Sequence, residues 1–124
     1  MLVVLLLVAA PLCCMTASIL YSGESMKPGE TISWANNQLV MQRDCDLVYY
    51  ANGRRLWASK TSGMGSDCYC TLQSDGNMVV YDNKGTPLWS SDTKRGQGFY
   101  VLIAQKDRNL VIYGTARWAT NTTI

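Results

Sequence analysis

The chain has 124 residues, which is enough for one domain and too few for two ordinary ones. Its formal charge is +2, from 11 Lys and Arg against 9 Asp and Glu, and no run of like charges supports nucleic-acid binding. Because it has no histidine, Ser-His-Asp and Cys-His catalysis, histidine-ligated zinc and a histidine pH switch are excluded.

Residues 1–17, MLVVLLLVAAPLCCMTA, have the pattern of a secretory signal peptide. Of these residues 15 are apolar, and the first charge in the chain is Glu24. The run is short for a membrane span and ends in small residues, so we expect cleavage near Ala17 and no membrane span. The predicted destination is the secretory pathway, either extracellular or vacuolar, and the predicted domain is residues 18–124. The alternative is a buried N-terminal helix.

Cleavage would leave three cysteines, Cys45, Cys68 and Cys70. A secreted chain tends to pair its cysteines, and three is an odd number. A bridge from Cys45 to either of the other two would close a loop of about 24 residues and stabilise the fold by roughly 3 kcal/mol.

One nine-residue motif occurs three times in this domain. It reads QRDCDLVYY at 42–50, QSDGNMVVY at 73–81 and QKDRNLVIY at 105–113. Each glutamine is followed by Asp at +2, Asn or Asp at +4, Val at +6 and Tyr at +8. A tryptophan follows each copy, at Trp57, Trp89 and Trp118. The domain is therefore predicted to be three copies of one unit.

Short runs rich in Val, Ile, Leu, Tyr and Trp alternate with turn signals such as Asn52-Gly53 and Asp75-Gly76, and no segment has a helical apolar period. This pattern predicts an all-β fold with about four strands per repeat. Three small sheets cannot each bury a core alone, so we expect them to pack around a pseudo-threefold axis. The three repeated tryptophans are predicted to fill that axis; the alternative is that they stack on a sugar ring.

The motif places polar and apolar groups on one surface. By strand alternation Asn77, Val79 and Tyr81 share a face, with the valine expected at the surface, while Met78 and Val80 point the other way. Gln73 and Asp75 join this patch across the predicted turn. Sugars need such a mixture of hydrogen-bond donors, acceptors and one apolar contact. Turn formation alone would explain the Asp and Asn, but not the recurring Gln, Val and Tyr.

The triplicated QxDxNxVxY motif resembles that of the monocot mannose-binding lectins, the snowdrop or bulb type, from about Leu20 to Thr120. The resemblance implies a β-prism II fold of three four-stranded antiparallel sheets, and three mannose pockets that use no metal or other cofactor. In that family Asp and Asn bind the 2-hydroxyl, Gln the 3-hydroxyl and Tyr the 4-hydroxyl, and Val touches the ring carbons. Two pockets keep the whole pattern. The second pocket is Gln73, Asp75, Asn77, Val79 and Tyr81, and the third pocket is Gln105, Asp107, Asn109, Val111 and Tyr113.

The first pocket departs from the pattern. It consists of Gln42, Asp44, Asp46, Val48 and Tyr50, with Asp46 in place of the expected asparagine. An ionised Asp has no N–H donor, and the loss of one donor to a sugar hydroxyl costs on the order of 1 kcal/mol. Repulsion from Asp44 could instead raise one carboxyl pKa, so that it donates as an acid. We expect the first pocket to be weak or silent near neutral pH.

The resemblance also implies a Cys45–Cys68 disulfide, which leaves Cys70 as a small buried hydrophobe or as a thiol that forms an intermolecular or alternative bridge. It further implies that the C-terminal strand is exchanged between subunits of a homodimer or homotetramer. Asn121-Thr122-Thr123 fits a glycosylation sequon close to that interface, so we expect it to be unmodified.

The predicted function is that of a multivalent, agglutinating lectin that binds mannose-containing glycans and glycoproteins in plant defence, and two other functions compete with it. A storage or protein-interaction module on the same fold would have inactive pockets, against which the two intact motifs argue. A glycosidase needs two carboxylates across one bond, whereas each intact motif supplies one, so we expect no enzymatic activity. Too few oxygen ligands gather in any motif for calcium.

Overall fold

A computed structural model describes residues 16–114 of the chain, and this part is built from strands and turns. Short runs of β-branched and aromatic residues form the strands, and glycine or asparagine turns separate them. Asn52 and Gly53, which the sequence predicts as a turn, both have positive φ, at 52° and 75°. The strands of the described residues are β1 (Thr16–Ala17), β2 (Ile19–Tyr21), β3 (Ser25–Met26), β4 (Thr31–Trp34), β5 (Asn37–Met41), β6 (Leu47–Ala51), β7 (Arg54–Ala58), β8 (Tyr69–Leu72), β9 (Met78–Tyr81), β10 (Pro87–Ser90), β11 (Tyr100–Ala104) and β12 (Leu110–Gly114).

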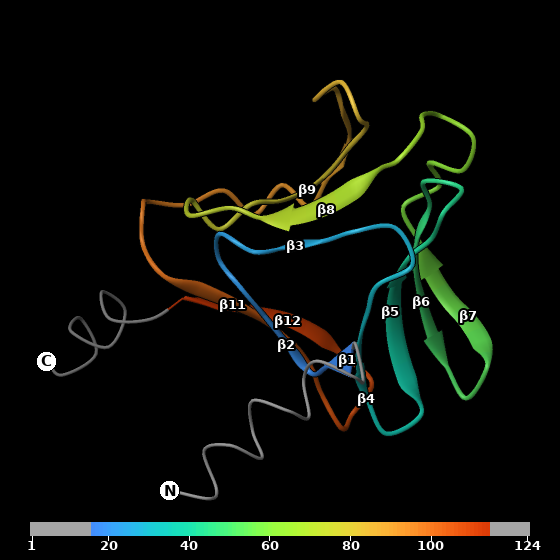
Figure 1. The fold of residues 1–124 in the computed structure, drawn as a ribbon. Helices are drawn as coiled ribbons and strands as arrows, with labels where there is room; N and C mark the ends of the chain where they lie inside the picture. Colours follow the sequence, from blue (N-terminus) through green and yellow to red (C-terminus); the bar gives the residue numbers. More distant parts are fainter. Residues whose placement is uncertain (1–15, 115–124) are drawn as a thin grey trace, which may run out of the picture.

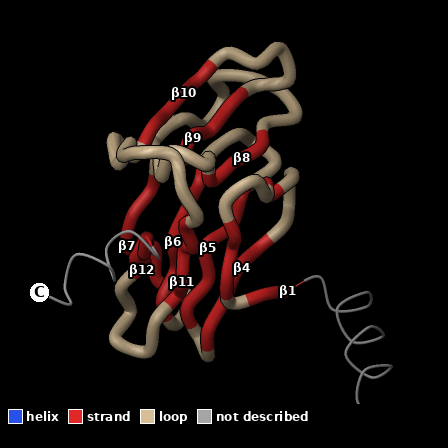
Figure 2. Tube along the Cα trace, turned by 90° about the vertical axis from the view of Figure 1, so that its left-hand side faces the viewer, coloured by secondary structure: helices blue, strands red, loops and turns tan. Residues whose placement is uncertain are grey.

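These strands form three sheets that lie as the three sides of a prism (Figure 1). The first sheet has the order β1-β4-β5-β6-β7, the second β10-β9-β8-β3 and the third β12-β11-β2. A turned view separates the second sheet from the strands of the other two (Figure 2). The predicted all-β, three-sheet fold is confirmed, and apart from the short parallel pair β1–β4 its strand pairs are antiparallel.

The second sheet has the expected four strands, whereas the first and third sheets differ from that number. The first sheet gains β1, which is made by the last two residues of the predicted signal peptide. The third sheet has three strands within residues 16–114 and takes β2 from the start of the domain. The predicted exchanged strand, Trp118 and the sequon lie outside the described residues, as do residues 1–15 of the predicted signal peptide.

The core comes from the inward faces of all three sheets. Leu39, Met41, Leu72, Val80 and Leu102 are at most 1% exposed and belong to one cluster. Burial of this kind contributes about 25 cal/mol per Å² of apolar surface. Because successive side chains of a strand point to opposite faces, the residues between these core positions face outward. The polar side chains of the motifs lie on this outer face.

The predicted tryptophan core is wrong for Trp57 and holds only in part for Trp89. Trp57 is 39% exposed on β7, an edge strand, whereas Trp89 is partly buried against the core. Their rings meet edge to face with centroids 5.1 Å apart. Other side chains, chiefly Leu, Met, Cys and Tyr, form the core cluster in the described part of the chain, and Trp89 packs against it from the margin.

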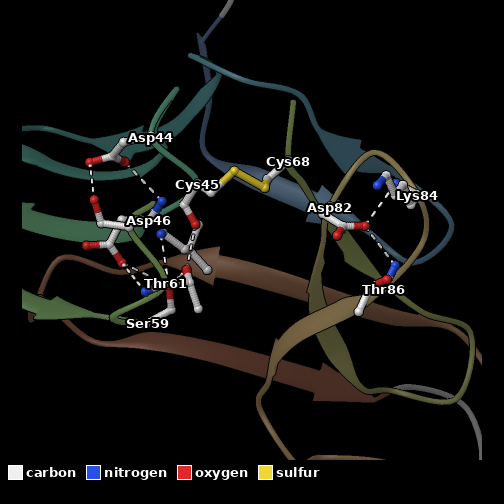
Figure 3. Close-up of a disulfide and its surroundings, with 11 residues drawn as sticks. Asp44, Cys45, Asp46, Ser59, Thr61, Cys68, Asp82, Lys84 and Thr86 are labelled. Atoms are coloured by element: carbon white, nitrogen blue, oxygen red, sulfur yellow. Dashed lines mark hydrogen bonds between the residues drawn. A yellow bond between two sulfur atoms is a disulfide. The ribbon is translucent and has the colours of Figure 1, made fainter. Parts of the chain in front are cut away.

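The disulfide joins Cys45 to Cys68, as the resemblance implied (Figure 3). It ties the first motif to the segment that leads into β8. Cys70 is a free thiol, buried in the core, and burial raises its pKa to about 12. Such a thiol is a poor nucleophile, so the structure favours the buried hydrophobe over the intermolecular bridge.

Tyr49 brings a polar atom into the core. It is 4% exposed, and its hydroxyl is the one buried side-chain oxygen or nitrogen of residues 16–114 that lacks a hydrogen-bond partner. Its pKa is raised, chiefly by burial and also by the charge of Asp107, against a smaller opposing effect of Arg108.

Replacing Tyr49 by phenylalanine is expected to increase the free energy of unfolding by about 1 kcal/mol, because a buried unpaired hydroxyl destabilises the folded state. Urea denaturation measures the change, with the exposed Tyr21→Phe as a neutral control. A decrease in stability would mean that the hydroxyl has a partner.

No helix in the described part of the chain has the length and apolarity needed to cross a membrane.

Candidate functional site

Each motif begins with the same hairpin turn. The last paired residues of the strands on either side of the turn are equivalent in the three copies: Met41 with Leu47, Leu72 with Met78 and Ala104 with Leu110. In every copy the glutamine N–H donates to the carbonyl four residues later, at 2.8 to 3.0 Å. The backbone of the turn is therefore equivalent in the three repeats.

The fourth residue of each motif has a left-handed backbone. The φ angle is 77° at Cys45, 86° at Gly76 and 72° at Arg108. Only glycine adopts this region freely, and other residues there cost on the order of 1 kcal/mol. The sequence reveals the requirement at Gly76 alone; at the other two positions hairpin pairing imposes it.

The motif aspartates have a structural task. Oδ1 of Asp44, Asp75 and Asp107 accepts the N–H of the residue two positions later, at 3.0 Å in each case. The predicted turn chemistry is thus present and occupies one carboxylate oxygen. The second oxygen of Asp75 has no protein partner within residues 16–114 and remains available to a ligand.

The motif glutamine and tyrosine form a pair in every copy. Glutamine Nε2 donates to the tyrosine Oη at 2.7 Å in the first pocket and 2.5 Å in the other two. Because Nε2 carries a second N–H and the phenol keeps its own proton, each pair still offers two donors to a ligand.

The motif valines are less exposed than the sequence predicts. Val48 is 1% and Val79 is 4% exposed, although neither belongs to the core cluster, and Val111 is partly buried. Strand alternation puts them on the outer face, and they are nevertheless covered there. They can form the floor of a shallow site but offer little apolar surface.

Asn77 is held by the segment after β10. Its Oδ1 accepts Ser90 Oγ at 3.0 Å, Ser91 Oγ at 3.1 Å and the Thr93 N–H at 3.2 Å. With its oxygen occupied, the amide is left with its two N–H groups to donate. Asn109 is exposed and donates from Nδ2 to Asp107 Oδ2 at 3.2 Å.

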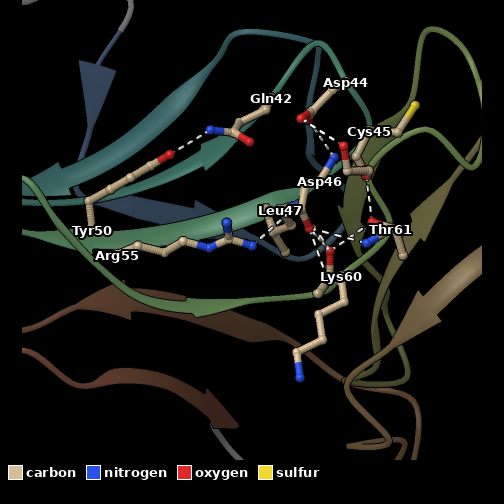
Figure 4. Close-up of polar contacts among 11 residues, drawn as sticks. Gln42, Asp44, Cys45, Asp46, Leu47, Tyr50, Arg55, Lys60 and Thr61 are labelled. Carbon is tan, nitrogen blue, oxygen red and sulfur yellow. Dashed lines mark hydrogen bonds and ion pairs between the residues drawn. The ribbon is translucent and has the colours of Figure 1, made fainter.

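Asp46 occupies the same place in the first pocket but has different chemistry (Figure 4). Its Oδ1 accepts from Ser59 Oγ and from the N–H groups of Lys60 and Thr61, at 2.8 to 3.2 Å. Its Oδ2 accepts Arg55 Nη2 at 3.2 Å, and the Asp46 side chain is only 4% exposed.

The predicted repulsion between Asp46 and Asp44 is not supported by this arrangement. The buried carboxylate of Asp46 is compensated by Arg55, and Asp44 Oδ2 accepts Ser62 Oγ at 3.0 Å. Each carboxylate thus has its own hydrogen-bonding partner.

The sequence does not predict a role for two residues that lie beside the motifs. Arg55 lies outside the motif, and only its departure from the proline found at the equivalent position of the second repeat, Pro87, distinguishes it. Trp34 is 44% exposed and lines a recess of about 470 Å³ together with Gln105 and Asp107 of the third pocket. In residues 16–114 no group of three or more Cys, Asp or Glu is placed to hold a metal ion.

The chain is similar to several bulb lectins. It is 60% identical over 107 residues to the mannose-specific lectin of Narcissus pseudonarcissus, covering 86% of this chain and 98% of that protein. Among solved structures, the snowdrop (Galanthus nivalis) agglutinin complexed with methyl-α-D-mannoside is 48% identical with a TM-score of 0.78, covering 85% of this chain and 96% of that one. The Polygonatum cyrtonema lectin complexed with monomannoside is 40% identical with the same TM-score, covering 86% and 97%.

No protein-family model matches the chain. The two solved relatives nevertheless share its three-sheet, β-prism II architecture over nearly their whole length, and the names of all three relatives describe lectins. The chain therefore belongs to the monocot mannose-binding, or bulb-type, lectin family.

Proposed function

We propose that this protein is a mannose-specific lectin whose second and third pockets bind terminal α-mannose of high-mannose glycans. The observation that carries the proposal is the repeated Gln–Tyr hydrogen bond beside an aspartate fixed by its own turn. The crystallised snowdrop and Polygonatum relatives were complexed with mannosides, which supports this ligand class.

The hydroxyl contacts follow from donors and acceptors that the protein leaves unused. In the second pocket, the 2-hydroxyl donates to the free oxygen of Asp75 and accepts from Asn77 Nδ2. Gln73 and Tyr81 bind the 3- and 4-hydroxyls. Glucose carries its 2-hydroxyl in the opposite orientation, which leaves Asp75 and Asn77 unpaired against the sugar and weakens binding.

Binding strength comes from several pockets acting together. A single site of millimolar affinity contributes about −4 kcal/mol, and a second pocket on the same particle then binds at a high effective concentration. We propose a homodimer or homotetramer in which the segment after β12 is exchanged between subunits. Its edge strand β12, unpaired on one side within residues 16–114, supports this assembly. The protein would enter the secretory pathway through residues 1–17 and act in defence, outside the cell or in the vacuole.

The test is inhibition of agglutination by monosaccharides. Methyl α-mannoside is expected to block the agglutination of yeast cells by the purified protein, and methyl α-glucoside to do so at least about tenfold less well, since one misplaced hydroxyl costs on the order of 1.4 kcal/mol. Equal inhibition by both sugars would contradict the pocket geometry. Failure to bind either sugar would favour a storage or protein-interaction role.

A further inference from the structure

The first pocket contains a side chain that the repeat pattern does not call for. Arg55 lies opposite Tyr50 in the pairing of β6 with β7, just as Pro87 lies opposite Tyr81 in the pairing of β9 with β10. Both pairings shift register directly after this point, so the two positions are structurally equivalent. The first repeat therefore differs from the second at two linked positions, Asp46 for Asn77 and Arg55 for Pro87.

The direction of the Arg55 side chain is fixed by its backbone position and by its ion pair. It starts beside Tyr50 and ends at Asp46, four residues away along the same chain segment, a span of about 13 Å. Directly opposed residues of an antiparallel pair project to the same face, so Arg55 runs along the outer face at the level of Val48. Figure 4 shows it extended between Tyr50 and Asp46.

The Arg55 side chain crosses the position at which the sugar is proposed to bind. A hexose that bridges the carboxylate end and the tyrosine end of the motif must lie over the valine between them. In the first pocket the guanidinium is there instead, 3.2 Å from Asp46 Oδ2, the oxygen that takes the place of the Asn77 amide nitrogen.

We propose that Arg55 is a specificity-determining residue that closes the first pocket to mannose, so that this chain has two working pockets and one that is filled by its own side chain. The proposal rests on the proposed function of the other two pockets. The ion pair accounts for both departures from the repeat, because the arginine compensates the buried carboxylate and the carboxylate holds the arginine in the pocket.

The side chain of Arg55 is 58% exposed, so its removal does not hollow out the core. Asp46 keeps the three hydrogen bonds to its other oxygen from Ser59, Lys60 and Thr61. Arg55→Ala should therefore fold and expose Val48, Gln42 and Tyr50 to a ligand.

The experiment is a titration with methyl α-mannoside followed by NMR of 13C-labelled tyrosine rings, because each pocket holds one motif tyrosine. In the wild-type protein the signals of Tyr81 and Tyr113 are expected to shift and that of Tyr50 to stay fixed. In Arg55→Ala the Tyr50 signal is expected to shift as well, with an affinity within about tenfold of that at Tyr81, since one donor is still missing. Asp46→Asn/Arg55→Ala should close that remaining gap.

Arg54→Ala is the matched control, because it removes the same charge from the adjacent exposed position, whose side chain points to the opposite face. Its Tyr50 signal should stay fixed. The proposal is overturned if Tyr50 responds in the wild-type protein or in Arg54→Ala, or if it stays silent in Arg55→Ala while Tyr81 and Tyr113 respond. If Tyr81 and Tyr113 are silent in the wild-type protein, the proposed function itself fails, and this inference fails with it.

Discussion

Replacing both Gln73 and Gln105 by alanine is expected to abolish retention of the protein on immobilised mannan. Each substitution removes an amide that we propose binds the sugar, and it leaves the motif tyrosine without its hydrogen-bond partner. The lost hydrogen bonds weaken each pocket by about 1 to 3 kcal/mol. Binding through two pockets on one particle increases the overall affinity by roughly 10²- to 10⁴-fold, and the double variant also loses this gain. It should therefore elute with the unbound fraction.

The single variant Gln73→Ala tests the contribution of multivalency. It should be retained weakly and elute at a much lower concentration of methyl α-mannoside than the wild-type protein. Gln38→Ala is the control, since this exposed glutamine lies on β5 and belongs to neither the second nor the third motif. Retention of the double variant at the wild-type level would show that these pockets do not carry the binding.

Removal of the Cys45–Cys68 disulfide is expected to lower the free energy of unfolding by about 3 kcal/mol, because the unfolded chain loses the constraint of a closed loop of about 24 residues. The test variant is Cys45→Gly/Cys68→Ala, in which glycine suits the positive φ at position 45 and adds no backbone strain. Urea denaturation of the variant and of the oxidised wild-type protein gives the difference.

Chemical reduction of the wild-type protein provides an independent measurement of the same loss. Cys70 is buried in the core, so its thiol is not expected to form a replacement bridge in the folded state. A destabilisation below about 1 kcal/mol in both measurements would contradict the assigned role of the bridge.

The sequence predicts most of the fold because its repeat is local. The strand that forms the second half of each motif alternates its side chains, which correctly assigns Met78 and Val80 to the core and Tyr81 to the outer face. The Asp-Gly turn at 75–76 is also where the structure has it. These features depend on neighbouring residues and need no knowledge of the packing between sheets.

The errors concern contacts made across the fold. Burial of Val79 depends on the strands and loops beside it, and exposure of Trp57 depends on its place at a sheet edge. Likewise, Asp46 is close to Asp44 in sequence, but its partners come from β7 and the loop that follows. A pattern of alternating residues contains no information about these distant partners.

The positions at which the first repeat differs from the others are the ones that indicate its altered pocket. Asp46 is visible as an exception within the motif, whereas Arg55 becomes meaningful only once strand register places it opposite Tyr50. Comparison of one repeat with another therefore identifies the unusual residues, and the structure supplies the contact that relates them.

The most direct measurement is the crystal structure of the protein soaked with methyl α-mannoside. We predict one sugar in the second pocket and one in the third, each with its 2-hydroxyl on the motif aspartate, and Arg55 still on Asp46 in the first. Empty second and third pockets at saturating sugar, or a mannoside bound elsewhere on the prism, would contradict the account.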